Sequence, residues 1–196
     1  MIAAEDVALV LLAAGQSTRF PGGNKLEAEF LAQPVGLHVV TALEAVPFLA
    51  RFVVTDGTKL HFAACEVIHN DAPEIGMAHS VKLGVARAAQ TEAKAVLIAL
   101  ADMPRVTATH IYRLFDAVEG DDAVVTSSDG VNPCPPAVFG RGRFGFLQSL
   151  KGDQGARDLV RAGRHVVTSP AELIDIDTPE DLERLMQLVH APERRG

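Results

Sequence analysis

Cysteine is scarce in this sequence: only two of the 196 residues, Cys65 and Cys134, are cysteines, and they lie far apart along the chain. A disulfide-stabilised fold or a structural zinc site needs several cysteine or histidine residues at short, regular spacing. The seven histidines are also scattered and show no ligand spacing. These features argue against both kinds of site and favour a reducing compartment, so we expect the protein to be cytoplasmic.

The sequence also lacks a long hydrophobic run. The longest apolar stretch near the start, residues 7–14, is well short of the roughly 20 residues that a membrane-spanning helix requires. It follows the acidic residues Glu5 and Asp6, whereas a secretory signal peptide carries basic residues before its apolar segment. We therefore expect neither a signal peptide nor an association with membranes.

Positive charge is in deficit, because 18 lysine and arginine residues stand against 25 acidic residues, for a net charge of -7. Nucleic-acid backbones attract clustered cations, so this acidic protein is not expected to bind nucleic acid. Hydrophobic residues make up 48% of the chain and charged residues 22%, which is typical of a globular protein with a buried core. Binding of a small anion such as a nucleotide then requires a few cations and backbone amides that converge at one place.

Short apolar segments alternate with segments of helical character along the chain. Strands are expected at residues 7–13, 52–55, 66–69, 95–101, 123–126, 137–139 and 165–168. Helices are expected at residues 37–45, 77–90, 107–118 and 154–162, and a last helix after Thr178. Thr178 offers an N-cap that is followed by a proline and then by acids, a strong signal for the start of a helix. Continuous apolar runs are typical of parallel strands covered on both faces, so the pattern predicts a Rossmann-like three-layer α/β/α fold with a mainly parallel sheet.

The first expected strand runs directly into a glycine-rich segment that ends at residue 26. A loop at the carboxyl end of the first strand is where open α/β sheets bind ligands, and its successive amides can bind an anion. Arg19 and Lys25 add two cations to this loop. The segment matches neither a Walker A loop nor the Gly-x-Gly-x-x-Gly dinucleotide fingerprint. It is a candidate phosphate site, and the alternative is a flexible turn with two solvated cations.

Two acidic positions are candidate metal ligands. Asp102 follows the most apolar strand and precedes Met103 and Pro104, which places it at the same sheet edge as the glycine-rich loop. Mg²⁺ that bridges nucleotide phosphates needs one or two carboxylates together with water, whereas an aspartate here could also simply cap a turn. Asp177 lies at the start of the last helix, where acids stabilise the helix N-terminus, so a metal role and a structural role both stay open for it.

Five motifs follow one another along the chain. They are Leu-Ala-Ala-Gly-x-Ser-x-Arg-Phe from residue 12 with Gly-Gly-Asn-Lys-Leu up to residue 26, Pro-Glu-Ile-Gly-Met-Ala-His-Ser at residues 73–80 with Gly84, Ala-Asp-Met-Pro at residues 101–104, Gly-Asp-Gln-Gly-Ala-Arg at residues 152–157, and Asp-Ile-Asp-Thr-Pro-Glu-Asp-Leu at residues 175–182. In this order they resemble the motifs of the nucleotidyltransferases that complete the molybdenum cofactor. The resemblance spans nearly the whole chain and is closest to the cytidylyltransferase branch, which makes molybdopterin cytosine dinucleotide.

The resemblance implies roles for individual residues. Nucleotide contacts are implied for Leu12, Ala13, Ala14, Gly15, Ser17, Arg19, Lys25, Gly76 and Ser80. Arg19, Lys25 and Asp102 are implied as catalytic residues, with Mg²⁺ held by Asp102 and Asp177. Residues 152–157 are implied on the acceptor side, although Asp153 could instead cap the helix that follows. We expect the whole chain, residues 1–196, to form one domain in which residues 130–164, rich in proline and glycine, form an acceptor-binding lobe.

Cys134 lies between prolines within that stretch and could line the acceptor pocket. We interpret it as a buried, inert thiol, because no histidine and acid are placed to activate it as a nucleophile. His79, next to Ser80, is interpreted as a histidine on a helix surface.

The implied reaction is transfer of CMP from CTP to molybdopterin, a phosphorylated pterin, with release of pyrophosphate. A molybdoenzyme or its maturation chaperone is implied as a partner. CTP is favoured because the guanylyl branch reads Leu-Ala-Gly-Gly, whereas this chain has Ala14 in the third place, and its methyl group narrows the base pocket against a purine.

Three alternatives remain open. One is a guanylyltransferase of the same pathway. Another is a different small-molecule phosphate cytidylyltransferase, although the methylerythritol-phosphate enzymes usually have Pro-Lys-Gln around the position of Lys25. The third is a non-catalytic nucleotide-binding module. Departures from the family pattern at residues 20–23 and 34–37 leave the phosphate geometry and the acceptor open.

Overall fold

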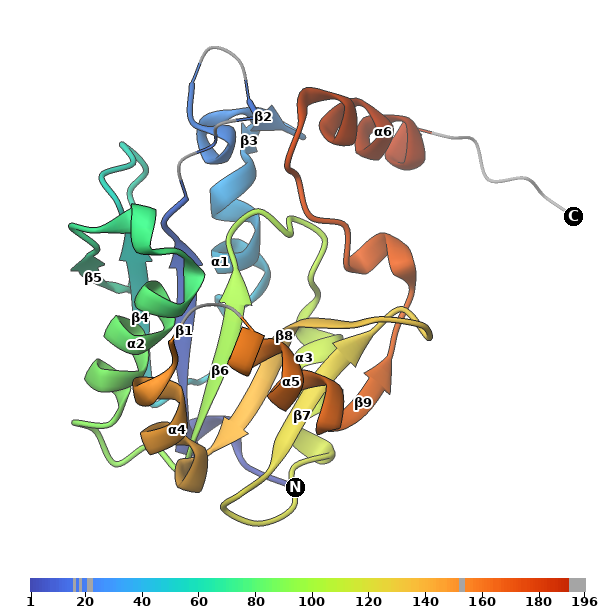
Figure 1. Cartoon of the computed structure of the whole chain (residues 1–196). Helices are drawn as coiled ribbons and strands as arrows, with labels where there is room; N and C mark the ends of the chain where they lie inside the picture. Colours follow the sequence, from blue (N-terminus) through green and yellow to red (C-terminus); the bar gives the residue numbers. More distant parts are fainter. Residues whose placement is uncertain (16, 18, 21–22, 152–153, 191–196) are drawn as a thin grey trace, which may run out of the picture.

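The computed structural model describes residues 1–15, 17, 19–20, 23–151 and 154–190. The described residues form a seven-stranded sheet in the order β5-β4-β1-β6-β8-β7-β9, and a two-stranded sheet of β2 and β3 (Figure 1). The strands are β1 (Val7–Ala13), β2 (Glu29–Phe30), β3 (Gln33–Pro34), β4 (Ala50–Thr55), β5 (Glu66–His69), β6 (Ala95–Leu100), β7 (Val124–Ser128), β8 (Pro133–Gly140) and β9 (Arg164–Val167). Strands β5, β4, β1 and β6 are parallel, β8 is antiparallel to both β6 and β7, and β9 is parallel to β7.

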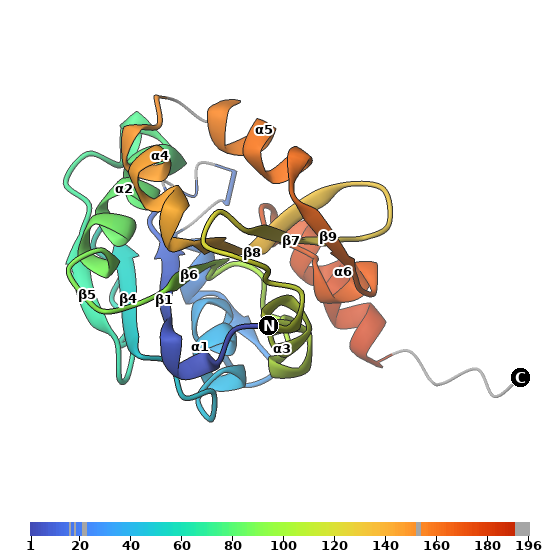
Figure 2. The ribbon, with the colours of Figure 1, turned by 90° about the horizontal axis from the view of Figure 1, so that it is seen from below.

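Helices cover both faces of the large sheet (Figure 2). The α-helices are α1 (His38–Ala42), α2 (Met77–Ala88), α3 (Ala108–Asp116), α4 (Phe144–Ser149), α5 (Gln154–Ala162) and α6 (Pro179–His190). Short 3-10 helices are η1 (Ala4–Asp6), η2 (Lys25–Glu27), η3 (Val35–Leu37), η4 (Pro73–Ile75), η5 (Arg141–Arg143) and η6 (Pro170–Glu172). Within the described part of the chain, no helix is long and apolar enough to cross a membrane. The three layers and the mainly parallel sheet confirm the predicted Rossmann-like α/β fold.

Strand β1 lies inside the sheet, and every one of its side chains is buried. Leu9 and Leu11 face the layer of α1 and α3, while Val10 and Leu12 face the layer of α2, α4 and α5. Helix α2 lies very close to this strand, because a Cβ atom at Gly84 would stand only 2.3 Å from Cγ1 of Val10. Gly84, which the sequence placed in a nucleotide-binding motif, therefore has a packing role that sets how near α2 comes to β1.

Residues 130–164 contribute β8, α4 and α5. Strand β8 lies between β6 and β7 in the large sheet, and α5 packs on β7 and β8. The stretch is thus continuous with the main sheet, and its role in acceptor binding stays a prediction. The structure also adds α4 and the β2–β3 hairpin, which the sequence patterns did not indicate. The predicted helix at residues 37–45 is shorter than expected, since Pro47 follows closely and cannot continue a helix.

A small third core attaches α6 to the β2–β3 hairpin. Phe30, Val35, Ile176 and Leu185 are buried together there, and Phe20 packs against them. Phe20 belongs to the glycine-rich segment, and Ile176 immediately precedes a predicted metal ligand. This core therefore joins two segments that carry predicted site residues.

Candidate active site

The predicted site residues gather at the carboxyl ends of β1 and β6. These parallel strands are in register, with Leu12 beside Leu100, so the glycine-rich loop after β1 and the turn that carries Asp102 leave the sheet side by side. The segment between β9 and α6 reaches the same edge, because the amide of Ile176 donates to the carbonyl of Asp102 over 2.9 Å. Asp177 follows directly. The fold thus brings together three segments that are far apart in the sequence (Figure 1).

Lys25 lies at the centre of a cluster of charges. Its Nζ donates to Oδ2 of Asp102 over 2.6 Å and to Oδ1 of Asp177 over 2.9 Å. The side chains are largely buried, with exposed fractions of 13% for Lys25, 17% for Asp102 and 31% for Asp177. Arg19 is more exposed and pairs with Oδ2 of Asp177 over 2.8 Å. In this structure two cations therefore neutralise the two carboxylates.

Short polar contacts shape the loop that presents Lys25. The amide of Lys25 donates to Oγ of Ser17 over 3.2 Å, and Oδ1 of Asn24 accepts from the amide of Leu26 over 3.0 Å, which begins the turn η2. Leu26 is buried and anchors this turn in the main core. Ser17 therefore has a positioning role that the sequence alone did not reveal. Residues 16, 18, 21 and 22 of the loop lie outside the described residues.

Asp56 also belongs to the site and was missed by the sequence patterns. It follows β4, the other neighbour of β1, and its Oδ2 accepts from the amide of Gly15 over 3.1 Å. An acidic residue at the end of the strand beside β1 was the available signal. The contact occupies one of the loop amides that were predicted to bind a nucleotide.

Two acids at the start of α6 have different environments. Oδ2 of Asp181 accepts from the amides of Asp177 and Thr178 over 3.2 and 2.9 Å, and Oγ1 of Thr178 accepts from the amide of Asp181 over 3.2 Å. This reciprocal arrangement is a capping box, and it begins the helix. The carboxylate of Asp177 instead pairs with Arg19 and Lys25. The helix-capping role thus falls to Asp181, and the metal role of Asp177 stays a prediction.

Glu172 anchors the segment that leads to Asp177. Its Oε1 accepts from Oγ1 of Thr107 over 2.7 Å, and its Oε2 accepts from the hydroxyl of Thr168. Partial burial would raise the pKa of Glu172, but the hydrogen bonds from Thr168 and Thr107 and nearby positive charge hold it below its usual value. The anchored carboxylate holds the segment after β9 against the start of α3.

The pKa values of the cluster follow from burial and from the neighbouring charges. Burial raises the pKa of Asp102, Lys25 opposes this rise, and Asp175 and Asp177 add to it. Burial would lower the pKa of Lys25, but the attraction of Asp102 and Asp177 outweighs it and raises the pKa above the usual value. Partial burial would raise the pKa of Asp177, but Lys25 and Arg19 hold it below its usual value. Asp102 is therefore the carboxylate whose burial is incompletely compensated.

One carboxylate oxygen of Asp102 lacks a partner among the residues that the structure describes. Its Oδ1 is buried, and no described residue forms a hydrogen bond with it. The part of the chain that the structure describes holds no group of three or more histidine, cysteine, aspartate or glutamate side chains that could bind a metal by themselves. Mg²⁺ commonly takes one or two protein carboxylates and completes its coordination with substrate phosphates and water. Asp102 and Asp177 thus fit a divalent cation that arrives with a triphosphate.

A polar pocket of about 300 Å³ opens over the charge cluster. Its lining residues are Gly15, Ser17, Arg19, Lys25, Pro73, Glu74 and Asp177. The pocket combines loop backbone, two cations and two carboxylates, and the turn before α2, which carries Pro73 and Glu74, lines its other side. This is the set of groups that a triphosphate and its counter-ions require.

The residues predicted to contact the nucleotide differ in accessibility. Leu12 and Ala13 are buried in β1, so a contact from them would run through the backbone, whereas Ala14 and Gly15 are accessible. Ser80 is buried, and its hydroxyl accepts from Nδ2 of Asn70 over 2.9 Å. Ser80 therefore supports the turn before α2 through its hydrogen bond with Asn70, and it does not line the polar pocket.

Two further residues shape this turn. Oδ1 of Asn70 accepts from the amide of Ala72 over 2.9 Å, so Asn70 links the buried Ser80 to the exposed part of the turn. Gly76 has φ 102° and ψ -179°, a conformation that is essentially restricted to glycine. Gly76 thus fixes the direction in which the chain enters α2.

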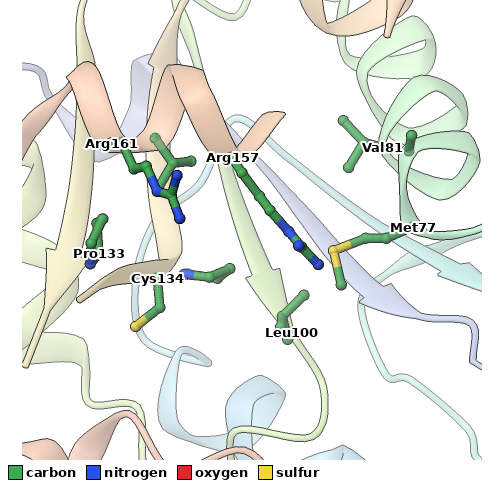
Figure 3. A pocket seen from close by; sticks show the side chains of 10 residues that line it. Met77, Val81, Leu100, Pro133, Cys134, Arg157 and Arg161 are labelled. Atoms are coloured by element: carbon green, nitrogen blue, oxygen red, sulfur yellow. The ribbon is translucent and has the colours of Figure 1, made fainter. Parts of the chain in front are cut away.

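A second, more apolar pocket of about 410 Å³ lies between α2, α5 and the start of β8 (Figure 3). Its lining residues are Met77, Ala78, Val81, Leu100, Pro133, Cys134, Pro135, Arg157, Val160 and Arg161. Arg157 and Arg161 point from α5 into the pocket (Figure 3). Arg157 belongs to the predicted acceptor motif, Arg161 was missed, and residues 152 and 153 of the motif lie outside the described residues.

Cys134 lines the apolar pocket as the sequence predicted. Burial raises the pKa of its thiol to about 11, and the nearby carboxylates Asp129 and Asp175 add to this rise. The thiol is therefore protonated at neutral pH, which agrees with its interpretation as an inert group. The charge of Asp175 also contributes to the raised pKa of Asp102.

Comparison with known proteins agrees with this geometry. The chain matches the model of the MobA-like NTP transferase domain over residues 9–167. The purine catabolism protein PucB of Bacillus subtilis (strain 168) is 32% identical over 197 residues, which cover 89% of this chain and 93% of that protein. Rv0371c from Mycobacterium tuberculosis H37Rv superposes on 94% of this chain and 100% of its own with a TM-score of 0.82 at 23% identity. A structure of Rv0371c in complex with manganese covers 92% of this chain and 98% of its own, with a TM-score of 0.73 at 22% identity.

The two structural likenesses show the fold, while the family model and PucB cover most of the chain. The glycine-rich loop and the strand-end Asp102 lie within the matched residues, and so do the residues that line the polar pocket, except Asp177. The chain therefore belongs to the family of MobA-like NTP transferases and is a nucleotidyltransferase.

Proposed function

We propose that the protein is a Mg²⁺-dependent cytidylyltransferase that transfers CMP from CTP to molybdopterin, a phosphorylated pterin, with release of pyrophosphate. The observation that carries this proposal is the position of Lys25 between Asp102 and Asp177, beside the glycine-rich loop and at the carboxyl ends of β1 and β6. The cations and loop amides suit a triphosphate, and the two carboxylates suit its metal.

The reaction is a displacement at phosphorus. An oxygen of the acceptor phosphate attacks the α-phosphorus of CTP, and the bond to the departing pyrophosphate breaks. The attacking oxygen is already anionic, so no general base is needed, and catalysis rests on positioning and charge neutralisation. Lys25 and Arg19 would turn from the aspartates to the triphosphate and stabilise the charge that builds up on pyrophosphate. Asp102 and Asp177 would then hold Mg²⁺, which supplies further charge neutralisation on the same oxygens.

The apolar pocket between α2, α5 and β8 is the proposed acceptor site. Leu100 lines this pocket and precedes Asp102 by two residues, so the pocket begins close to the turn that carries Asp102. Apolar side chains suit a flat ring system, and Arg157 and Arg161 suit its phosphate.

The preference for CTP rests on Ala14, which is accessible at the end of β1. We propose that its methyl group reduces the space for the base, since a pyrimidine needs less space than a purine. The amides of the same loop supply hydrogen-bond donors to the base and to the phosphates.

A screen of nucleotides tests the proposal. CTP, GTP, ATP and UTP are each incubated with the protein, molybdopterin and Mg²⁺, and pyrophosphate release is measured. Release that is fastest with CTP and requires both molybdopterin and Mg²⁺ is expected. Fastest release with GTP would point to the guanylyl alternative, and release with CTP and a different phosphorylated acceptor would point to another cytidylyltransferase. Nucleotide binding without release from any NTP would contradict catalysis.

A further inference from the structure

Lys25 occupies the position at which a divalent cation would contact both Asp102 and Asp177. Its ammonium lies 2.6 Å from Oδ2 of Asp102 and 2.9 Å from Oδ1 of Asp177, so one positive centre bridges the two carboxylates. The other oxygen of Asp177 is engaged by Arg19 at 2.8 Å. Of these carboxylate oxygens, Oδ1 of Asp102 alone has no hydrogen-bond partner among the residues that the structure describes.

A divalent cation cannot enter this arrangement while the ammonium stays in place. Positive charges a few ångströms apart repel strongly in a largely buried site, where water screens them poorly. A metal that displaced Lys25 without offering it another anion would leave a mostly buried ammonium unpaired, which is unfavourable. The cluster therefore opposes metal binding as long as Lys25 has no other partner.

We infer, on the basis of the proposed function, that Lys25 is an internal counter-ion that excludes the divalent metal from Asp102 and Asp177 until a nucleotide binds. The triphosphate offers Lys25 a new anionic partner. When Lys25 turns to the triphosphate, Asp102 and Asp177 lose their bridging partner. The two carboxylates would then be free to hold the metal that accompanies the nucleotide. The same side chain thus contacts the phosphates and sets the order in which metal and nucleotide bind.

This exchange couples the two ligands. By linkage, the nucleotide raises the affinity for the metal by the same factor by which the metal raises the affinity for the nucleotide, typically about 5- to 150-fold. Loss of the ammonium removes the competitor for the carboxylates. The affinity for the metal alone should then rise by about tenfold or more, within the same range.

The test is a titration of the full chain with Mn²⁺ in the absence of nucleotide. Free Mn²⁺ is measured by electron paramagnetic resonance, and the melting temperature is measured in parallel, because a ligand that binds the native state stabilises it. Lys25→Met keeps most of the side-chain length and removes the charge. Lys25→Arg keeps the charge and can still bridge two carboxylates.

Two control variants remove a positive charge elsewhere. Arg19→Gln removes the charge beside Asp177 but leaves the ammonium between the carboxylates. Lys94→Met removes a charge from an exposed ion pair with Asp6, before the start of β6 and thus at the far end of that strand from Asp102. Screened surface charges have small effects, so Lys94→Met should bind Mn²⁺ within about twofold of the wild type.

The proposal expects tighter Mn²⁺ binding and a Mn²⁺-dependent rise in melting temperature for Lys25→Met, and neither change for Lys25→Arg. Arg19→Gln should gain clearly less affinity than Lys25→Met. Equal Mn²⁺ affinities in the wild type and Lys25→Met, or an equal gain in Arg19→Gln, would overturn it. If Lys25→Met does not fold, Lys25→Gln is interpreted in the same way.

The titration contains neither nucleotide nor acceptor, so it is independent of turnover. Failure of every NTP to release pyrophosphate would contradict the proposed function, whereas the competition between Lys25 and Mn²⁺ would still be measured. Equal Mn²⁺ affinities in the wild type and Lys25→Met would contradict the role of Lys25 as a counter-ion, whereas the proposed function would still be decided by pyrophosphate release from the wild type.

Discussion

At the scale of single residues, Asp102 lies in an unfavourable setting for a carboxylate. Burial raises the pKa of its carboxyl, Lys25 compensates only in part, and Oδ1 has no partner among the described residues. Buried polar atoms in native proteins nearly always have partners, so an exception needs an explanation. The proposed function explains this exception, because a divalent cation that enters with the triphosphate would be the partner of this oxygen.

Replacement of Asp102 tests this explanation. Asp102→Asn keeps the shape of the side chain but removes the charge that would hold the cation, so Mg²⁺-dependent pyrophosphate release should fall by about 100-fold or more. The exposed Asp116→Asn at the end of α3 serves as the control and should retain wild-type turnover. Turnover and Mg²⁺ dependence that persist in Asp102→Asn would place the metal elsewhere.

The proposed preference for CTP depends on Ala14. Discrimination by a methyl-sized difference in a pocket amounts to about 1–3 kcal/mol, or roughly 10- to 200-fold in kcat/KM. Ala14→Gly should therefore reduce the ratio of CTP to GTP efficiency while pyrophosphate release continues, because the cations and carboxylates are unchanged. Kinetics with both nucleotides measure this ratio. An unchanged ratio in Ala14→Gly would mean that another residue selects the base.

At the scale of elements, the close packing of α2 on β1 positions one wall of each pocket. Helix α2 carries Met77 and Ala78 in the apolar pocket at its start, and Gly84 lies against Val10 of β1 in its middle. The turn before α2 is held by the buried pair of Asn70 and Ser80. Gly84, Asn70 and Ser80 line neither pocket, but they position α2 and the turn before it, which do.

A methyl group at Gly84 should separate α2 from the sheet. Its Cβ would lie 2.3 Å from Cγ1 of Val10, so Gly84→Ala should lower the free energy of unfolding by about 1–3 kcal/mol. Val10→Ala provides space, and the double variant should be less destabilised than the sum of the single variants. Gly145→Ala in α4, where a Cβ meets nothing within 4 Å, is the matched control and should be neutral or stabilising. Chemical denaturation measures all four, and strict additivity would contradict the proposed clash.

His110 joins α3 to the sheet and should make stability depend on pH. Oγ of Ser127 donates to the carbonyl of Pro136 over 2.7 Å and therefore accepts from Nε2 of His110 at 2.8 Å, which places a proton on Nε2. Nδ1 is buried and has no hydrogen-bond partner among the described residues, so a second proton there is unfavourable. Burial lowers the pKa of His110, with the nearby Glu172 acting against it. The native state thus resists protonation, while the unfolded chain takes up a proton near pH 6.5, so the free energy of unfolding should decrease as the pH falls below about 6.5.

His110→Gln should remove part of this decrease, because glutamine can still bond with Ser127 but does not titrate. The exposed His61→Gln is the control and should keep the wild-type dependence. Denaturation between pH 5 and 8 is the measurement, and identical profiles for His110→Gln and the wild type would contradict the assignment.

At the scale of the whole molecule, three apolar clusters hold the chain together, and the smallest one reaches the site. The two large clusters fill the layers on either side of the sheet. The third packs α6 on the β2–β3 hairpin, with Ile176 just before Asp177 and Phe20 just after Arg19. Packing in this cluster therefore determines how the cation of the loop meets the carboxylate of the C-terminal segment.

Leu185→Ala probes this long-range link. Leu185 is fully buried, so its truncation should cost about 2–5 kcal/mol of stability, and it should also lower the turnover of the folded protein because Asp177 and Arg19 lose their common support. Leu114→Ala, at an equally buried position of α3 in a large cluster, should cost a similar free energy without lowering the turnover of the folded fraction. Denaturation and pyrophosphate release below the melting temperature measure the two effects. Equal effects on turnover would indicate a general loss of stability.

Local signals along the chain predicted much of the fold. The apolar runs of β1 and β6 appeared where expected, as did the capping box of Thr178 and Asp181, because each depends on neighbouring residues. The direction of β8 was not determined, since a continuous apolar run is buried equally well in a parallel or an antiparallel strand. Helix α4 and the β2–β3 hairpin were missed because they are too short to show a period.

The candidate site, too, was predicted only in part from the sequence. Its position at the strand ends, with Arg19 and Lys25 in a glycine-rich loop and an acid after β6, was determined by the sequence itself, because parallel strands present their carboxyl ends at one edge. Only the tertiary structure decided that Lys25 bridges Asp102 and Asp177, which lie far from it in the chain. The pairing of β1 with β6 brings Asp102 to Lys25, and the packing of α6 brings Asp177 there. The tertiary structure likewise placed Ser80 inside the core and Arg161 in the apolar pocket, because which face of a helix is covered depends on what packs against it.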